Sequence, residues 1–159
     1  MPTTPHRLLT AAALTLTLSL GAARAADTGP APEADTLSAA RAQIAQKKWA
    51  AAVDELKKVN DSGSADWNNL MGYSLRKSAT PDYAGAEKYY DAALRIDPKH
   101  KGALEYSGEL YLITGKLPQA EQRLATLDKV CRLPCEEYTD LKKSVARYKA
   151  NGNKYVAAP

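Results

Sequence analysis

Apolar and small residues recur at helical spacing along most of the chain. Between Ala65 and Pro98 they fall every three to four residues on two stretches, which the polar turn Ser78–Asp82 separates. Small residues stand where the two stretches would touch, with Gly72 on the first and Ala86 and Ala93 on the second. Larger apolar residues fill the rest of the interface: Leu70, Leu75, Tyr83, Tyr90 and Leu94. The pattern predicts an antiparallel hairpin of two amphipathic helices.

The same spacing recurs before and after this hairpin. The small residues in equivalent places of the three copies are Ala40 and Ala52, Gly72 and Ala86, and Gly108 and Ala120. The period is close to the ~34 residues of one class of helical repeat. One hairpin cannot bury its apolar face alone, so we expect an all-α stack of three hairpins, at about residues 35–60, 66–97 and 100–131.

From about Ala34 to Val130 these residues resemble the motif of the tetratricopeptide repeat family. Two features depart from it. Trp67 stands five positions before Gly72 where the family has Trp four before, and Asn68 takes the expected place. The turn Ser78–Asp82 also holds two more residues than the turns of the other copies. The order of the segments GYSLRK, ALEYSGELYL and CEEY resembles small exported bacterial members of the family without an assigned role.

Residues 1–25 have the composition of a signal peptide. Arg7 precedes an apolar run from Leu8 to Ala22, and Ala23-Arg24-Ala25 offers the small residues that a signal peptidase recognises. The run is short for the alternative, an uncleaved membrane anchor. We expect cleavage after about Ala25, location in the periplasm and no stable membrane insertion afterwards. Residues 26–34 should form a flexible lead-in.

Charge and histidine content narrow the function classes. Cleavage removes Arg7 and Arg24, so the net charge falls from +4 to +2, and nucleic acid is not the expected partner. His100 is the one remaining imidazole and has no metal ligands at suitable spacing, so we expect it to lie exposed in a linker. With no phosphate loop and no nucleophile–base pair, we expect neither catalysis nor a cofactor or metal.

A last amphipathic helix is predicted over residues 135–150. Its apolar positions are Tyr138, Leu141, Val145 and Tyr148. It has no partner hairpin, so we expect it to cap the array. Residues 151–159 should form a disordered tail.

Cys131 and Cys135 are the two cysteines of the chain. In an exported protein we expect a structural disulfide that fastens the last helix to the third hairpin. The alternative is a thiol–disulfide redox protein, because Cys135 begins a helix and a helix N-terminus stabilises thiolate. The spacing is not CxxC, and Glu136 and Glu137 oppose a thiolate, which favours the structural bridge.

The family resemblance implies that the first helices of the hairpins line a concave groove for partner peptides. Aligned on the small residues, the groove positions are Arg41, Asn69, Tyr73, Arg76, Lys77, Glu105 and Glu109. The same alignment adds Leu37, Ile44 and Leu112. The set is mixed in sign and includes Tyr and Arg, which often anchor interfaces. The expected function is a non-catalytic scaffold or adaptor that binds a segment of another envelope protein. Alternatively, these are only solvated helix positions.

Overall fold

The structure is a computed structural model that describes Met1 and residues 35–133 and 135–156. The expected signal peptide and lead-in, apart from Met1, lie outside the described residues. Within those ranges all the regular structure is helical. The helices are α1 (Ser38–Ala45), α2 (Trp49–Val59), α3 (Ala65–Lys77), α4 (Tyr83–Ile96), α5 (Lys101–Ile113), α6 (Leu117–Val130) and α7 (Glu136–Ala150).

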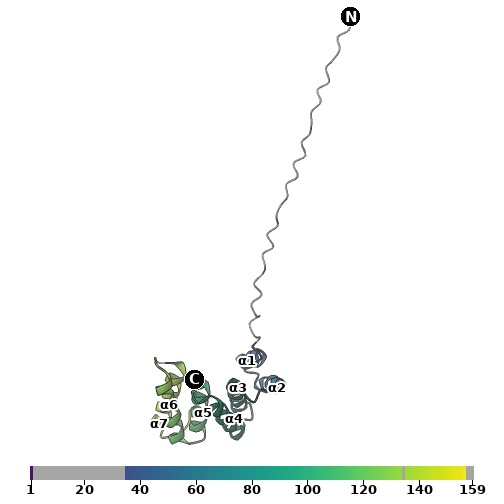
Figure 1. Cartoon of the computed structure of the whole chain (residues 1–159). Coiled ribbons are helices and arrows are strands. Elements are labelled where there is room, and N and C mark those ends of the chain that lie inside the picture. Colours follow the sequence, from purple (N-terminus) through teal and green to yellow (C-terminus); the bar gives the residue numbers. More distant parts are fainter. Residues whose placement is uncertain (2–34, 134, 157–159) are drawn as a thin grey trace. The chain divides into compact units, whose positions relative to one another are not determined.

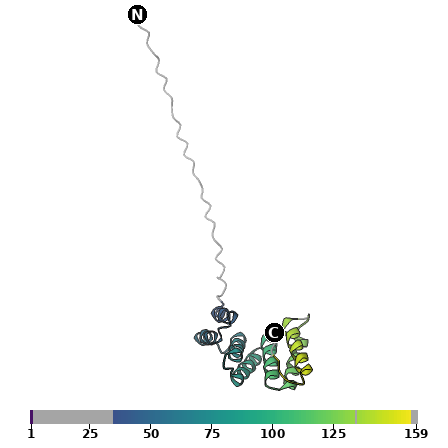
Figure 2. The ribbon, with the colours of Figure 1, turned by 180° about the vertical axis from the view of Figure 1, so that it is seen from behind.

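Consecutive helices pair into hairpins (Figure 1). The pairs are α1 with α2, α3 with α4, and α5 with α6, while α7 packs against both α5 and α6. Seen from behind, the helices succeed one another in the same order along the array (Figure 2). The predicted fold, three helix hairpins and a final capping helix, is confirmed.

The contact inside the second hairpin depends on the glycine that the sequence pattern identified. A Cβ added to Gly72 would lie 2.8 Å from Cε1 of Tyr90 and 3.1 Å from the carbonyl oxygen of Ala86. Ala86 and Tyr90 are fully buried. The close approach of α3 and α4 therefore requires a residue without a side chain here. Tyr83 was predicted to share this interface and does not, since it is 37% exposed at the start of α4.

Side chains at the helix starts supply the caps. Ser64 Oγ accepts from the Trp67 amide at 3.2 Å. Asp82 Oδ1 accepts from the Gly85 amide at 2.8 Å, so α4 starts after Asp82. The helix begins there because the Asp82 side chain satisfies a free amide of the first turn.

His100 is the cap of α5, and the prediction that it lies exposed in a linker was wrong. Its Nδ1 accepts from the Ala103 amide at 3.1 Å. Its Nε2 lies 2.8 Å from Oδ1 of Asp66, in the first turn of α3, and its side chain is only 13% exposed. The imidazole therefore links the starts of two successive first helices.

The departure from the family motif near Gly72, with Trp67 one position early and Asn68 in its place, also has a structural role. The Trp67 indole nitrogen donates to the carbonyl oxygen of Leu56 at 2.7 Å and thereby joins α3 to α2. The Asn68 amide nitrogen donates to the carbonyl oxygens of Ser62 and Ser64 at 2.9 and 2.8 Å. Asn68 therefore fixes the turn before α3, and the indole one residue earlier packs against the preceding hairpin.

The junction between α6 and α7 brings the two cysteines together. Cys131 is the C-cap of α6 and Cys135 the N-cap of α7, so the helix breaks between them. Their sulfurs lie 2.01 Å apart, at disulfide distance, with the Cα atoms 5.8 Å apart. Leu141 and Val145 of α7 join a core that contains Leu104 and Leu127 of the third hairpin. The last helix thus covers the apolar side of that hairpin.

Candidate functional site

A row of aromatic rings links the three hairpins. The ring of Trp49 meets that of Tyr73 edge to face, with centroids 5.7 Å apart. Tyr73 in turn lies 4.6 Å from Tyr106 of α5, ring to ring. We call Trp49, Tyr73 and Tyr106 the aromatic row. Burial raises the pKa of Tyr106 to about 12, with a further contribution from Glu105, so its hydroxyl is neutral at physiological pH.

Arg76 lies against this row and is paired with an acid. Its Nη1 donates to Glu109 Oε2 at 2.7 Å, and its side chain is 3% exposed. The guanidinium carbon lies 5.5 Å from the Tyr73 ring centroid and 5.6 Å from that of Tyr106. Burial alone would lower the pKa of Arg76, but Tyr90 and Glu109 outweigh it and raise the pKa. Arg76 is therefore a permanent cation that joins α3 to α5.

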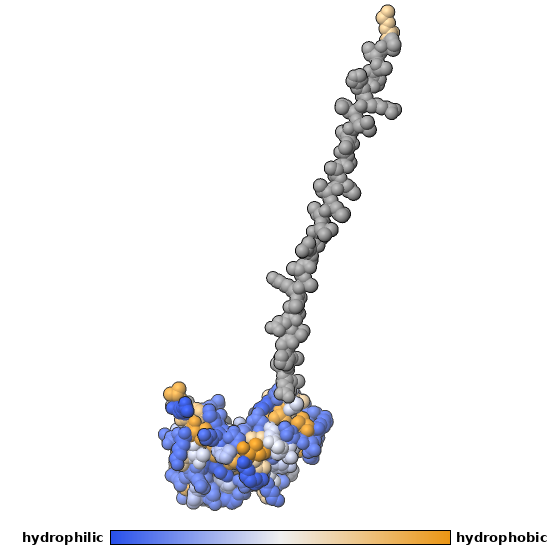
Figure 3. Space-filling view, viewed as in Figure 1, coloured by the Kyte–Doolittle hydropathy of each residue, from blue (hydrophilic) through white to orange (hydrophobic). Residues whose placement is uncertain are grey.

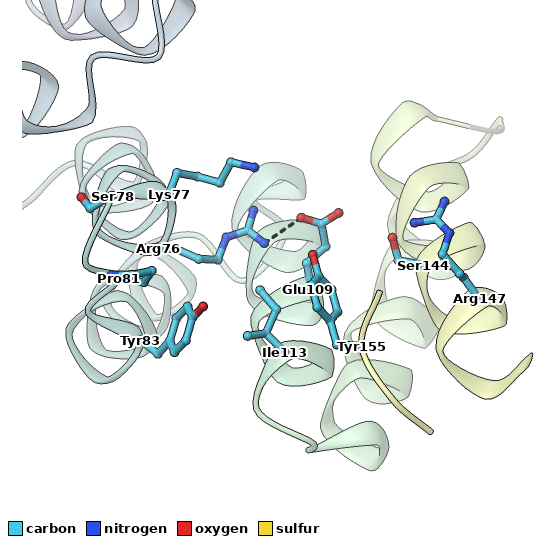
Figure 4. Close-up of a pocket in the computed structure, with 10 residues that line it drawn as sticks. All are labelled: Arg76, Lys77, Ser78, Pro81, Tyr83, Glu109, Ile113, Ser144, Arg147 and Tyr155. Carbon is cyan, nitrogen blue, oxygen red and sulfur yellow. Dashed lines mark hydrogen bonds and ion pairs between the residues drawn. The ribbon is translucent and has the colours of Figure 1, made fainter. Parts of the chain in front are cut away.

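A cavity of about 330 Å³ opens beside this ion pair. Its lining comes from α3, the turn after it, α4, α5, α7 and the segment after α7 (Figure 4): Arg76, Lys77, Ser78, Pro81, Tyr83, Glu109, Ile113, Ser144, Arg147 and Tyr155. The turn with two extra residues thus supplies one wall. The opposite wall carries Ser144 and Arg147, and Figure 4 shows the Arg76–Glu109 pair between the two.

Acidic side chains gather between α5 and α7. Burial raises the pKa of Glu105 to about 8, and the nearby charges of Glu109, Asp140 and Glu137 raise it further, while Arg76 acts in the opposite direction. A carboxyl group with this pKa is largely protonated at neutral pH. It presents a hydroxyl donor rather than a negative charge.

The face of the array seen in Figure 3 is mainly polar. Figure 3 shows hydrophilic surface over most of the helical array, broken by separate apolar patches. A partner on this face would meet polar surface with separate apolar patches rather than one continuous apolar groove.

The structure brings four of the seven predicted groove residues together. Tyr73, Arg76, Lys77 and Glu109 lie at the aromatic row or the cavity. Glu105 belongs to the acidic group beside them.

Arg41 lies at a different place on the array. It pairs with Asp66 at 2.7 Å and with Asp35 at 3.5 Å, both outside the cavity lining.

Several predicted groove positions are buried instead of open. Asn69 and Arg76 are 7% and 5% exposed, because α5 packs over this part of α3. Leu37 and Leu112 were also expected in the groove, and this was wrong. Both are core residues, Leu37 with Leu56 and Trp67 of the neighbouring helices and Leu112 in the core that α7 completes.

The prediction missed the wall of the cavity that α7 and the segment after it supply. Ser144, Arg147 and Tyr155 come from α7 and the segment after it, which were predicted as a cap and a disordered tail. The structure describes residues 151–156 of this segment, and Tyr155 lines the cavity. The feature of the sequence that could have indicated the cavity is the longer turn after α3, which provides Ser78 and Pro81.

Neither a metal site nor a membrane span is found in the part of the chain that the structure describes. No group of three or more His, Cys, Asp or Glu side chains there is placed to hold a metal ion. None of the described helices is both long and apolar enough to cross a bilayer.

Stacked antiparallel hairpins with a capping helix define the chain as a helical-hairpin repeat protein. Residues 81–143, from the start of α4 into α7, match the sequence profile of the tetratricopeptide repeat. This match supports the resemblance to the tetratricopeptide repeat family over that part of the chain. Comparisons with curated proteins and with solved structures found no match.

Proposed function

We propose that this protein is a non-catalytic interaction module that binds a segment of another protein on the face formed by α3, α5 and α7. The observation that carries the proposal is the cavity between these helices, next to the aromatic row. Stacked hairpins present a continuous surface of this kind, and tetratricopeptide repeats generally use theirs to bind protein partners.

The chemistry of this face suits a short segment with polar and aromatic side chains. Lys77 and Arg147 carry positive charge at the cavity, and Arg76 is neutralised by Glu109. Tyr83 offers an exposed ring at the same place. With about three repeats the contact area is modest, and we expect affinity in the micromolar range that weakens with salt.

We also propose that the interaction takes place in the bacterial cell envelope. The support is the signal peptide pattern of residues 1–25 together with two cysteines at disulfide distance. The partner would then be another exported protein.

Site-specific photo-cross-linking tests the face. A benzophenone amino acid is placed at Lys77, which lines the cavity, and in a second protein at Lys88, an exposed residue of α4 outside it. We expect discrete cross-linked bands from position 77 in intact cells and none from position 88. Equal patterns at the two positions would exclude this face. The variant Lys77→Ala with Arg147→Ala, probed from Tyr83, should lose the bands.

For Cys131 and Cys135 we propose a structural bridge rather than the redox alternative. The pair joins the cap residues of α6 and α7, and α7 supplies one wall of the cavity. We expect the bridge to resist a glutathione buffer and the Cys131→Ser, Cys135→Ser variant to melt at lower temperature while still cross-linking from position 77. Rapid exchange with glutathione would instead favour the redox function.

A further inference from the structure

The segment after α7 turns back sharply. Gly152 and Asn153 have φ of 65° and 61°, in the left-handed region. The Asn153 amide donates to the carbonyl oxygen of Tyr148 at 3.0 Å, and the Gly152 amide to that of Lys149 at 3.1 Å. These bonds satisfy the last carbonyls of α7 and reverse the direction of the chain. The next residues therefore return along the helix rather than continuing away from it.

Tyr155 is the residue that this reversal delivers to the cavity. Its ring lies between α5 and α7 with the hydroxyl end toward Glu109 (Figure 4). Tyr155 lies outside the helices, yet it is only 41% exposed. Burial raises the pKa of its phenol, as does the negative charge of Glu109, whereas Arg76 and Arg147 lower it. The phenol is thus flanked by charges from α3, α5 and α7.

The cavity has the polarity that a phenol needs. The open volume of about 330 Å³ lies beside Tyr155, which forms part of its wall, so a partner segment can approach the place that the phenol takes. The lining of the cavity combines apolar surface from Pro81 and Ile113 with polar groups of both signs. A phenol has an apolar ring and a hydroxyl that both donates and accepts, so it matches such a lining better than an aliphatic or a charged side chain does.

We propose that the place which Tyr155 takes in the cavity wall, between α5 and α7, is a receptor for a tyrosine side chain on an extended partner segment, and that such a segment displaces Tyr155 from it. The proposal rests on the proposed function, since it names the kind of partner that the same face binds. Among the described residues the backbone hydrogen bonds after α7 end at Asn153, so the displacement of residues 154–156 breaks no backbone hydrogen bond.

Competition follows from the connection between Tyr155 and the cavity. A segment tethered a few residues away has an effective concentration in the millimolar range. An external segment must outcompete that concentration, so the parent protein binds it more weakly than a protein whose own tyrosine is removed. This difference is what a binding experiment measures.

The test uses the full chain after signal-peptide removal and a fluorescein-labelled peptide with the sequence of residues 151–159, NGNKYVAAP. Fluorescence anisotropy should show binding to the Tyr155→Ala protein at least about tenfold tighter than to the parent. A peptide with Ala in place of its tyrosine should lose binding, and a peptide with Phe should keep part of it. The inference is overturned if no peptide binds the Tyr155→Ala protein up to several millimolar, or if the tyrosine and alanine peptides bind alike.

Matched variants locate the peptide. In the Tyr155→Ala protein, Ser144→Leu fills the cavity from α7, while Ala146→Leu adds the same side chain at an exposed position two residues away. We expect the first to abolish peptide binding and the second to leave it unchanged, with helicity by circular dichroism confirming that both proteins fold. Loss of binding in neither variant, or in both, would place the peptide elsewhere.

The two proposals fail in different ways. If the peptide does not bind but cross-links still form at Lys77 and not at Lys88, the interaction face stands and the tyrosine specificity is wrong. If the peptide binds but positions 77 and 88 cross-link alike, the proposed function falls and the cavity is only a site for the chain's own segment. Where both hold, Tyr155→Ala should strengthen the cross-links from position 77.

Discussion

Two ion pairs join successive first helices of the array, and they differ in burial rather than in length. Arg41 of α1 pairs with Asp66 of α3 at 2.7 Å, with side chains 45% and 53% exposed. Arg76 of α3 pairs with Glu109 of α5 at the same distance, with side chains 3% and 25% exposed. Water screens the first pair, whereas the arginine of the second is buried against aromatic rings. The two pairs have the same length, but removing the buried pair should cost far more stability than removing the exposed one.

Removing the two arginines gives the largest contrast. We expect Arg76→Met to destabilise the protein by about 3–5 kcal/mol, because Glu109 is left partly buried without its cation. Arg41→Met should cost less than about 1 kcal/mol. Urea unfolding followed by circular dichroism measures both. Adding Glu109→Gln should restore much of the stability lost in Arg76→Met, and equal losses in the two single variants would refute the distinction.

The distance between the two helices of each hairpin gives the next largest effect on stability. Gly72 lies on α3, the helix that also carries Arg76, and Gly72→Ala should cost about 1–3 kcal/mol because the new methyl group meets Tyr90 and the Ala86 carbonyl. The first hairpin already holds a methyl group at the equivalent position, Ala40, which is 1% exposed. There the reverse change, Ala40→Gly, should be the destabilising one, by about 1 kcal/mol. A thermal melt in which Gly72→Ala is neutral would show that α3 and α4 can separate.

Glu105, which lies near the buried pair, should make the stability of the protein depend on pH. Its pKa is about 8 in the folded protein and near 4.5 when free, so the folded state holds a proton that the unfolded state releases between these values. Stability from this group is present below pH 4.5 and lost as the pH rises toward 8. At pH 8.5 we expect Glu105→Gln to stabilise the protein by about 1–2 kcal/mol, after allowance for partial solvent exposure.

The control for this pH effect is the same pair of proteins at pH 5. There the difference between Glu105→Gln and the parent should nearly vanish, because the carboxyl group is neutral in the folded parent. A stability difference that is constant from pH 5 to 8.5 would mean that Glu105 stays ionised.

Asp66 should give the smallest effect. Burial alone would raise its pKa, but hydrogen bonds from His100 and Arg41 outweigh this and lower it, so its contribution is present at neutral pH and lost on acidification. Asp66→Asn should cost roughly 0.5 kcal/mol in dilute buffer. The loss should shrink in molar salt, whereas that of Arg76→Met should not. Melting temperatures of both variants at two salt concentrations provide the measurement.

The hairpins could be predicted from local sequence patterns, because the contacts inside a hairpin join residues that are close in the sequence. Gly72 and Ala86 meet as expected, since both lie on one hairpin and its apolar period fixes their register. The partners of His100 and Arg76 are 34 and 33 residues away and depend on how successive hairpins stack. Spacing within a helix carries no information about that stacking, so the burial of Arg76 and the capping role of His100 could not be anticipated.

The cavity, too, could be predicted from the sequence only in part. Lys77 and Glu109 were expected to face a partner, and both line the cavity. Its other wall comes from α7 and from Tyr155, whose arrival depends on two residues with positive φ after the helix. Gly152 favours that conformation, yet the direction in which the reversed chain then runs is set by the packing of α7 on α5 and α6.

The position of the tryptophans determines what optical spectroscopy can detect in this protein. The chain has two, and they stand in α2 and α3. Trp67 is 5% exposed and meets Tyr89 edge to face at 5.8 Å, while Trp49 contacts Tyr73. Intrinsic fluorescence therefore reports the first two hairpins, whereas ellipticity reports every helix. Denaturation curves from the two signals would coincide if the array unfolds as one unit and would separate if α5–α7 unfold independently.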